Sequence, residues 1–378
     1  MAKQAYVYSG TDWVPLASEV TNLSGYQTKA LNQFPYRNLL INGDMQIAQR
    51  STSVASNTAG GYLTADRFNN QLSSLGTWTQ SVENDAPTGS GFRKSLKMLC
   101  TTADASPAAG DYNIISQFIE GQNLQQIAKG TASAQQLTLS FWVKSNVTGT
   151  YIAELQDVDN TRIASASYSV SASGTWEKKT ITFPADTTGA FDNDNALSLA
   201  VNFWLGAGST WTSGTLSTSW TSTTSANRAV GQTNLASATN NYWQVTGVQL
   251  EVGDTATPFD FLPYDVELLR CFRYFYRLAH SSHGLGTAHT TSAVYGFIYN
   301  PVPFRTNPNV TTSNMGVWDG QTAFGGGTYT VSDYTIDNFG CGIARLNYAH
   351  TTTGLTQYRP YFISQSSGGG WIALSAEL

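Results

Sequence analysis

The stretch VTGVQLEVGDTATPFDFLPYDVELLRCFRYFYR, residues 245–277, decides how this chain is organised. It begins with alternating apolar and polar residues, which is typical of a strand with one buried face. Gly253, Pro258 and Pro263 then interrupt the strand, and the fixed backbone of proline sets the direction in which the chain leaves it. Aromatic residues and arginine crowd the remainder. The pattern predicts a joint between two β domains.

The joint itself, residues 265–278, fits either of two structures: about three turns of helix, or a short helix that ends as a strand. Both alternatives stay open from the sequence. Five apolar side chains would be exposed there in an isolated domain: Leu268, Leu269, Phe272, Phe275 and Tyr276. Such a patch is normally covered, and identical chains around a three-fold axis could cover it. We therefore predict a subunit interface in a homotrimer, with packing between two domains of one chain as the alternative.

Upstream of the joint, the chain repeats the strand pattern many times. Leu137, Leu139, Phe141 and Val143 alternate with polar residues, and similar segments recur with turns every 8–12 residues or so, as in a β-sandwich or jelly roll. We predict an all-β protein with three parts: an N-terminal anchoring segment (1–36), a jelly-roll β-sandwich (37–264), and a connector with a smaller C-terminal β-sandwich (265–378). Residues 5–16 suggest a small hairpin, which cannot bury a core alone.

Composition excludes several classes of protein. Of the 378 residues, 12% are charged, about half of the usual share, and 12% are aromatic. The net charge of −5 and the lack of a basic run argue against nucleic-acid binding. No apolar stretch approaches the ~20 residues of a membrane span, and the N-terminus does not resemble a signal peptide. Three distant cysteines without a CxxC motif indicate neither a disulfide framework nor a zinc site.

Four segments together resemble a recurrent type of bacteriophage tail-fibre and head-fibre protein. They are RNLLINGDMQIAQR at 37–50, YLTADRF at 62–68, LSFWVKSN at 139–146, and residues 245–275. The resemblance implies that residues 37–275 form a jelly roll similar to carbohydrate-binding modules. It also implies a subunit made in the host bacterial cytoplasm and carried on the virion surface, in a tail fibre or a capsid fibre. Such subunits are often trimeric and attach to host glycans. Residues 1–36 would then dock onto other virion proteins.

A glycan site needs an aromatic platform for the C–H face of a sugar, with polar groups around it. Trp211 and Trp220 are the candidates, because they lie in a tract rich in Ser, Thr and Gly at 205–240. Their alternative roles are anchoring of the loop and packing between subunits. Trp204 and Trp243 lie on patterned strands and are predicted to belong to the core.

Catalysis on a glycan would need two carboxylates roughly 5–9.5 Å apart across the sugar. Asp157 with Asp159, and Asp192 with Asp194, are the candidates, and both pairs resemble solvated turns. We therefore predict that the protein is not an enzyme. Calcium coordination by these turns and glycan depolymerisation are the alternatives. A further alternative is a decoration or adaptor protein of the capsid or tail without host contact.

Two further metal sites are considered. The resemblance to carbohydrate-binding modules implies a structural calcium ion near the first and last strands of the jelly roll, where Asp44 and Glu251 lie. His280 and His283 could present imidazoles to a metal on a symmetry axis, or they could be polar linker residues. No cofactor other than calcium is implied.

Overall fold

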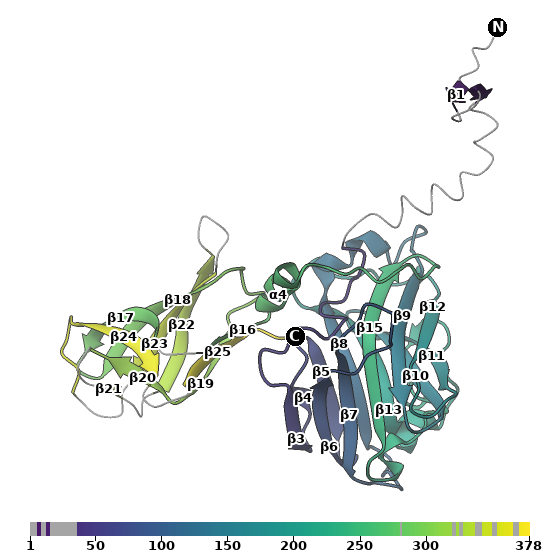
Figure 1. The fold of residues 1–378 in the computed structure, drawn as a ribbon, viewed down its shortest axis with the longest axis horizontal. Coiled ribbons are helices and arrows are strands. Elements are labelled where there is room, and N and C mark those ends of the chain that lie inside the picture. The colour runs from purple at the N-terminus through teal and green to yellow at the C-terminus, as the bar shows by residue number, and fades with distance from the viewer. Residues whose placement is uncertain are drawn as a thin grey trace.

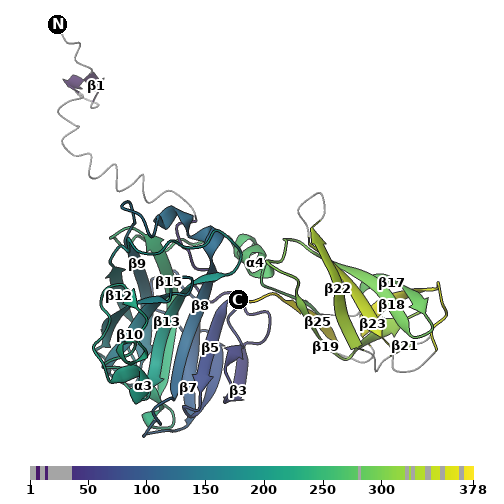
Figure 2. The same cartoon turned by 180° about the vertical axis from the view of Figure 1, so that it is seen from behind.

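The fold is seen in a computed structural model, which describes residues 6–8, 13–15, 36–279, 282–319, 323–324, 328–336, 342–349, 354–365 and 370–378. Two β units lie on either side of helix α4 (Tyr264–Phe272) (Figures 1 and 2). Where the structure describes the chain, the paired strands are antiparallel, apart from one isolated parallel bridge; this confirms the all-β prediction. Among the described residues, none of the helices is long and apolar enough to cross a membrane.

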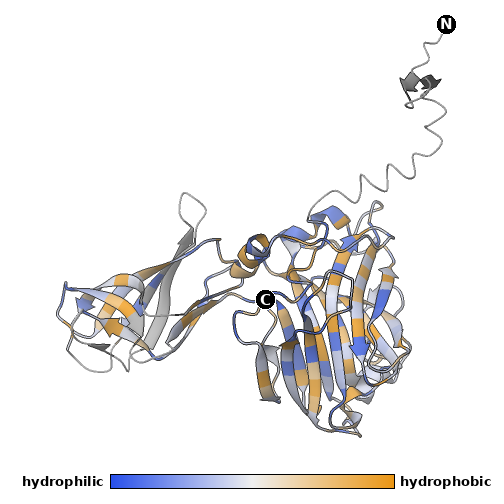
Figure 3. Cartoon of the chain, in the orientation of Figure 1, coloured by the Kyte–Doolittle hydropathy of each residue, from blue (hydrophilic) through white to orange (hydrophobic). Residues whose placement is uncertain are grey.

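The larger unit is a sandwich of two antiparallel sheets. The seven-stranded sheet has the order β14 (Thr221–Ser222), β11 (Arg162–Val170), β10 (Gly149–Asp157), β13 (Leu197–Ala207), β8 (Tyr112–Glu120), β5 (Phe68–Ser73) and β4 (Gly61–Tyr62). The six-stranded sheet has the order β12 (Glu177–Phe183), β9 (Leu137–Ser145), β15 (Tyr242–Val252), β7 (Ser95–Thr102), β6 (Thr77–Glu83) and β3 (Ser53–Asn57). Apolar and polar segments alternate along these strands in Figure 3, because successive side chains point to opposite faces.

The core of the sandwich follows from this alternation. On β9 the predicted apolar face is buried, and Phe141 packs edge-on against Phe203 of β13 across the sandwich, at 5.0 Å between ring centroids. Trp243 of β15 lies in the same core, as its strand pattern predicts. Trp204 is also fully buried, but in a separate cluster with Ile114 and Ile152. These residues alternate with the core residues of their strands, so this cluster lies on the outer face of the seven-stranded sheet.

The motif RNLLINGDM holds the closing strand of the sandwich. The Oδ1 atom of Asn38 accepts hydrogen bonds from the backbone of Leu40 and Leu250. Gly43 accepts one from the backbone N–H of Val248 at 2.9 Å. A Cβ at Gly43 would lie 2.1 Å from the carbonyl oxygen of Val248, so only glycine permits this close approach.

The connector is a helix followed by a strand, which settles the alternative left open by the sequence. After α4 the chain enters β16 (Phe275–Ala279), which pairs with the last strand, β25 (Trp371–Ser375), and β25 pairs with β19 (Asn309–Ser313). A seven-stranded sheet has the order β21 (Ala323–Phe324), β20 (Met315–Trp318), β24 (Pro360–Gln365), β17 (Ser282–Thr290), β18 (Ala293–Asn300), β23 (Gly342–Ala349) and β22 (Thr328–Ile336). β16, β25 and β19 form a three-stranded sheet. Residues of this sheet and of the seven-stranded sheet form one core.

The long tract 208–241 is a folded connection between β13 and β15. It contains α3 (Ser209–Thr212), the edge strand β14, and two 3-10 turns, η4 (Ser225–Asn227) and η5 (Leu235–Ser237). At the N-terminus, β1 (Tyr6–Tyr8) pairs with β2 (Trp13–Pro15), which confirms the predicted hairpin. The remainder of the predicted anchoring segment, residues 16–35, lies outside the described residues.

Candidate functional site

A cavity of about 650 Å³ lies beside α4, at one end of the sandwich. Its size falls within the range typical of ligand pockets. Four parts of the chain contribute to its wall: the segment before β3, strand β8, the 3-10 turns η2 (Gly121–Asn123) and η3 (Gln125–Ile127), and the end of α4. The lining residues are Tyr36, Asn38, Leu39, Ile41, Gln117, Phe118, Ile119, Gln122, Asn123, Gln126, Arg270, Arg273 and Tyr274.

The rim of the cavity carries the groups that are available to a ligand. Asn123 and Gln126 are exposed, and each amide can both donate and accept hydrogen bonds. Tyr36 is 59% exposed, so its ring is open to contact with a ligand. Arg270 is held by Glu267 at 3.3 Å, and a quarter of its side chain is accessible. The rim therefore combines amides, a guanidinium and an aromatic ring.

The deeper wall is fixed by hydrogen bonds. Arg273 donates from Nε and NH2 to the two oxygens of Glu120, at 2.7 and 2.6 Å. Burial alone would raise the pKa of Glu120, but the hydrogen bonds from Arg273 and Tyr274 hold that pKa below its usual value. Burial raises the pKa of Tyr274 to about 12, so its hydroxyl stays protonated and donates to Glu120. Glu120 is therefore a fixed, neutralised carboxylate.

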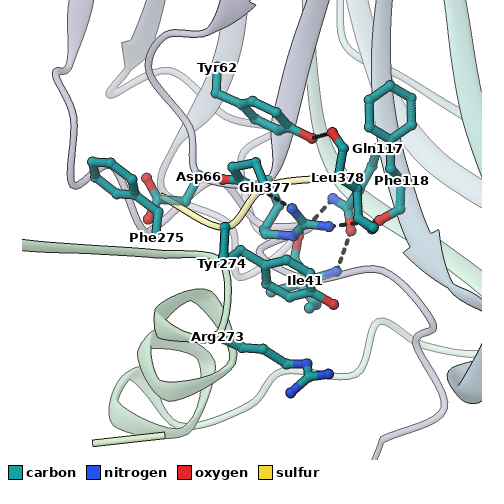
Figure 4. Close-up of polar contacts among 12 residues, drawn as sticks. Ile41, Tyr62, Asp66, Gln117, Phe118, Arg273, Tyr274, Phe275, Glu377 and Leu378 are labelled. Carbon is teal, nitrogen blue, oxygen red and sulfur yellow. Dashed lines mark hydrogen bonds and ion pairs between the residues drawn. The ribbon is translucent and has the colours of Figure 1, made fainter. Parts of the chain in front are cut away.

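Behind this wall, the C-terminal residues return to the sandwich. Glu377 forms ion pairs with Arg67 and with Arg50, and Tyr62 donates a hydrogen bond to the carbonyl oxygen of Leu378 at 3.1 Å (Figure 4). The side chain of Arg67 is 1% exposed. A buried charge is strongly destabilising unless an opposite charge pairs with it. The ion pair of Arg67 with Glu377 therefore ties the C-terminal residues to the jelly roll.

The predicted interface residues lie around the same junction. Leu268 packs against a small cluster that contains Ile41 and Cys271. Phe275 is buried and stacks with the guanidinium of Arg50, so the chain itself covers it. Leu269 is exposed, and Leu268, Phe272 and Tyr276 are partly exposed. The subunit interface stays a prediction, for which these four side chains supply the accessible area.

Trp211 anchors the long connection to the outer face of the sandwich. Its ring lies 5.3 Å from Tyr112 and 5.8 Å from Trp204, measured between ring centroids. Its Nε1 donates to the carbonyl oxygen of Gly110 at 3.3 Å. Arg228 stacks on the ring, at 5.6 Å from the centroid. The side chain is half-buried, so only part of its ring faces solvent.

Trp220 is held at a different place. Its Nε1 donates to the carbonyl oxygen of Pro184 at 2.8 Å, and the Nζ atom of Lys129 lies 5.3 Å from the ring. Trp220 packs against the main core, whereas Trp211 packs against the outer cluster. The two tryptophans thus belong to different clusters, and their role in glycan contact stays a prediction.

The candidate catalytic carboxylates are engaged in local contacts. Asp157 is fully buried, pairs with Lys129 at 2.5 Å and accepts a hydrogen bond from the backbone of Asn160. Asp159 accepts a hydrogen bond from the backbone of Asp192, and Asp194 accepts one from the backbone of Ala196. These contacts show how the carboxylates hold turns in place.

Asp44 and Glu251 have separate neighbours. Glu251 accepts hydrogen bonds from Thr257 and Gln249, so it holds the turn after β15. Burial, and then the nearby Glu267 carboxylate, raise the pKa of Asp44 to about 6. No group of three or more His, Cys, Asp or Glu that could hold a metal occurs within the described part of the chain. The contacts of these two residues do not make a ligand set, and the calcium ion stays a prediction.

The histidine prediction falls on a part of the chain whose side chains are not described. His280 lies outside the described residues, and only the backbone of His283 is described, in β17. His289, which the sequence did not single out, stacks on Tyr295 with 4.9 Å between ring centroids.

The cavity was not anticipated from the sequence. Tyr36 and Arg270 lie on its wall although they are far apart along the chain. The amides at 122, 123 and 126 offered a weak signal, because a polar run interrupts the strand pattern there. Only the turns η2 and η3 bring these amides to the same opening.

No protein-family model and no curated protein sequence matches the chain. Among solved structures, similarity is found to the enzymatically active domain of tailspike protein 4 from bacteriophage CBA120. The identity is 15% over 58% of this chain, the TM-score is 0.30, and the match spans only 22% of the tailspike chain. A second similar structure is TmCBM61 in complex with β-1,4-galactotriose, with 10% identity over 57% of this chain and 99% of that chain, at a TM-score of 0.28.

The third is the tripod (BppUct-A-L) from the baseplate of bacteriophage Tuc2009. It has 13% identity over 88% of this chain and 91% of that chain, at a TM-score of 0.27. The structural neighbours thus include phage tail proteins and a carbohydrate-binding module. All three TM-scores are low, so the functional assignment below rests on the residues of this chain.

Proposed function

We propose that this chain is a non-enzymatic subunit of a phage virion fibre that binds glycans of the host surface. The observation that carries the proposal is the cavity beside α4, whose rim presents free amides, a guanidinium and the exposed ring of Tyr36. Sugars are recognised by aromatic faces together with groups that donate and accept hydrogen bonds. The rim offers both within one opening.

The surrounding structure suits a binding site rather than a reactive one. Glu120 is bonded to two residues of the wall, Arg273 and Tyr274, which neutralise its charge. General acid catalysis on a glycan would need a protonated carboxyl group, which a carboxylate with a lowered pKa does not supply. This wall therefore favours recognition over cleavage.

Fibre subunits would act in groups. One shallow site gives weak binding, but several copies on one fibre raise the overall affinity by orders of magnitude. We therefore propose a homotrimer, carried on the virion surface through the N-terminal segment. A decoration or adaptor protein without host contact is the competing function, and it would show no glycan binding at all.

The test is the binding of purified full-length protein to surface polysaccharide extracted from the host, measured by calorimetry. The double variant Asn123→Ala with Gln126→Ala removes two rim amides. A hydrogen bond contributes about 1 kcal/mol, so we expect binding to weaken by at least about tenfold. The variant Trp211→Ala with Trp220→Ala tests the sequence-based site in the same assay.

The matched control is Asn84→Ala with Gln357→Ala, which removes two exposed amides outside the cavity. It should bind like the wild type. Normal binding by the cavity variant would reject this site, and absence of binding by the wild-type protein would reject the glycan function. Shortening of the polysaccharide during the assay would instead favour the depolymerase.

A further inference from the structure

Five large apolar side chains lie exposed on the seven-stranded sheet of the C-terminal unit. They are between 38% and 63% exposed. Together they form the apolar row, which consists of Trp318, Phe362, Leu285, Phe297 and Tyr299.

Strand register places the row across four neighbouring strands. Trp318 of β20 is paired with Phe362 of β24, and their ring centroids are 5.8 Å apart. Phe362 is paired in turn with Leu285 of β17. The next pair along, Gly286 with Gly296, places Phe297 of β18 beside Leu285. The row therefore runs perpendicular to the strands, and Tyr299 extends it along β18.

The fold keeps this row on the surface. Neighbours on the same strands point to the opposite face, where Val317, Tyr361 and Ile298 are buried in the core. Because the side-chain period of a strand is two, the row cannot turn inward without exposing that core. The exposed patch is thus a fixed feature of the sheet.

The patch reaches the size of the largest apolar patch on a typical monomer, about 300–600 Å², and patches of that size are often functional. Aromatic side chains offer about 150–250 Å² each, so five large apolar groups that are roughly half exposed present on the order of 500 Å². Monomeric proteins rarely expose more than a few hundred Å² of contiguous apolar surface. One partner in a stable interface contributes about 800 Å². The row alone supplies more than half of that.

We propose that the apolar row is the surface through which copies of this chain associate. Copies of one surface that meet around a three-fold axis repel each other least where no charge lies near the axis, and the row contains none. Charged side chains lie beyond its ends: Arg345 stacks on Tyr295, and Arg359 pairs with Asp319 at 3.3 Å.

The chemistry of the row favours protein over glycan as its occupant. Leu285 lies at its centre and offers neither a flat ring nor a hydrogen bond to a sugar. Phe297 and Phe362 on either side lack a polar tip. Aliphatic and phenylalanine side chains of this kind match the apolar core of a protein interface.

This inference rests on the self-association part of the proposed function and is independent of glycan binding. The experiment measures the mass of the full-length protein by light scattering and by sedimentation at micromolar concentration. As a homotrimer, the wild type should have about three times the mass of one chain, which is 40.8 kDa. Leu285→Glu with Phe297→Glu places charges at the centre of the row and should give the mass of a single chain.

The matched control is Lys178→Glu with Thr180→Glu, which places negative charges at two exposed positions on β12 of the jelly roll and should keep the wild-type mass. The milder Leu285→Asn, which should shift the mass toward a single chain at low concentration, covers the case in which the charged variant fails to fold. Circular dichroism verifies folding.

A single-chain mass for the wild type, or a wild-type mass for a folded double variant, would overturn the inference. So would a monomeric wild type whose glycan binding is lost in the double variant, since the row would then be a glycan surface. If the monomeric variant still binds glycan through the cavity, the proposed glycan site is unaffected. Failure of the association surface can therefore be distinguished from failure of the glycan site.

Discussion

The guanidinium of Arg67 lies over the ring of Tyr274, with 3.4 Å between its carbon and the ring centroid. Arg67 belongs to the jelly roll and Tyr274 to the end of the connector. The same guanidinium pairs with Glu377 and donates to the carbonyl oxygen of Phe118 at 2.7 Å. One buried cation therefore links the sandwich, the connector and the last residues of the chain.

Removing the charge of Glu377 should destabilise the whole protein. Glu377→Gln leaves the buried Arg67 without its counterion, which typically costs about 3–5 kcal/mol. We expect the free energy of unfolding in urea to fall by this order. The control is Asp254→Asn, which alters an exposed carboxylate and should change stability little. An equal effect of both variants would contradict the proposed role of Glu377.

Asp157 should prove structural rather than catalytic. Asp157→Asn removes one counterion of the buried Lys129 while Asp186 remains at 3.1 Å. Because that second partner remains, we expect a moderate loss of stability, about 1–3 kcal/mol, in thermal or urea unfolding. Asp194→Asn, at an exposed turn, serves as the comparison and should unfold like the wild type. Glycan cleavage that disappears in either variant would show the depolymerase instead.

Asp44 should make stability depend on pH. Burial and the neighbouring Glu267 raise the pKa of Asp44 from 3.8 to about 6, so between these values the folded chain binds a proton that the unfolded chain does not. The contribution of Asp44 to the free energy of unfolding therefore falls as pH rises from about 4 to 6. Asp44→Asn has no carboxyl group to ionise at this position, so its stability lacks this loss at higher pH.

Relative to the wild type, Asp44→Asn should accordingly be more favourable at pH 7 than at pH 4. Urea unfolding at a series of pH values measures this difference. Parallel pH profiles for the two proteins would show that the carboxyl group titrates alike in both states.

Trp211 should stabilise the long connection. Trp211→Ala removes the contacts with Tyr112, Trp204 and Arg228, and a half-buried tryptophan should contribute about 2 kcal/mol. Trp211→Phe keeps an aromatic ring but loses the hydrogen bond to Gly110. Its stability should therefore lie between that of the wild type and that of Trp211→Ala. Thermal unfolding measures the order. If all three proteins melt together, the ring does not anchor the connection.

Local patterns in the sequence accounted for much of the architecture. Alternation at Leu137–Ser145 predicted a half-buried strand, and the structure has β9 there. The hairpin near the N-terminus was predicted, and the helix that ends as a strand in the connector was one of the two alternatives considered. Such predictions depend on residues a few positions apart, whose periodicity reports the local backbone directly.

The candidate site could not be predicted in this way. Arg67 and Glu377 are 310 positions apart, and neither residue lies in a pattern that points to the other. Trp211 and Trp220 stood out because of their polar surroundings, yet the structure assigns their rings to two separate clusters. Composition identified them as unusual but carried no information about what they contact.

By itself, the sequence determined the all-β character of this protein, the position of its joint and the abundance of aromatic side chains. Those properties follow from the alternation of apolar residues and from the stiffness of proline, which act locally. Only the tertiary structure decided that rim amides meet Arg270 at one cavity, and that Leu285 stands in line with Phe362 and Trp318. Strand register and sheet order set those neighbours, because hydrogen bonds between strands join residues from distant parts of the chain.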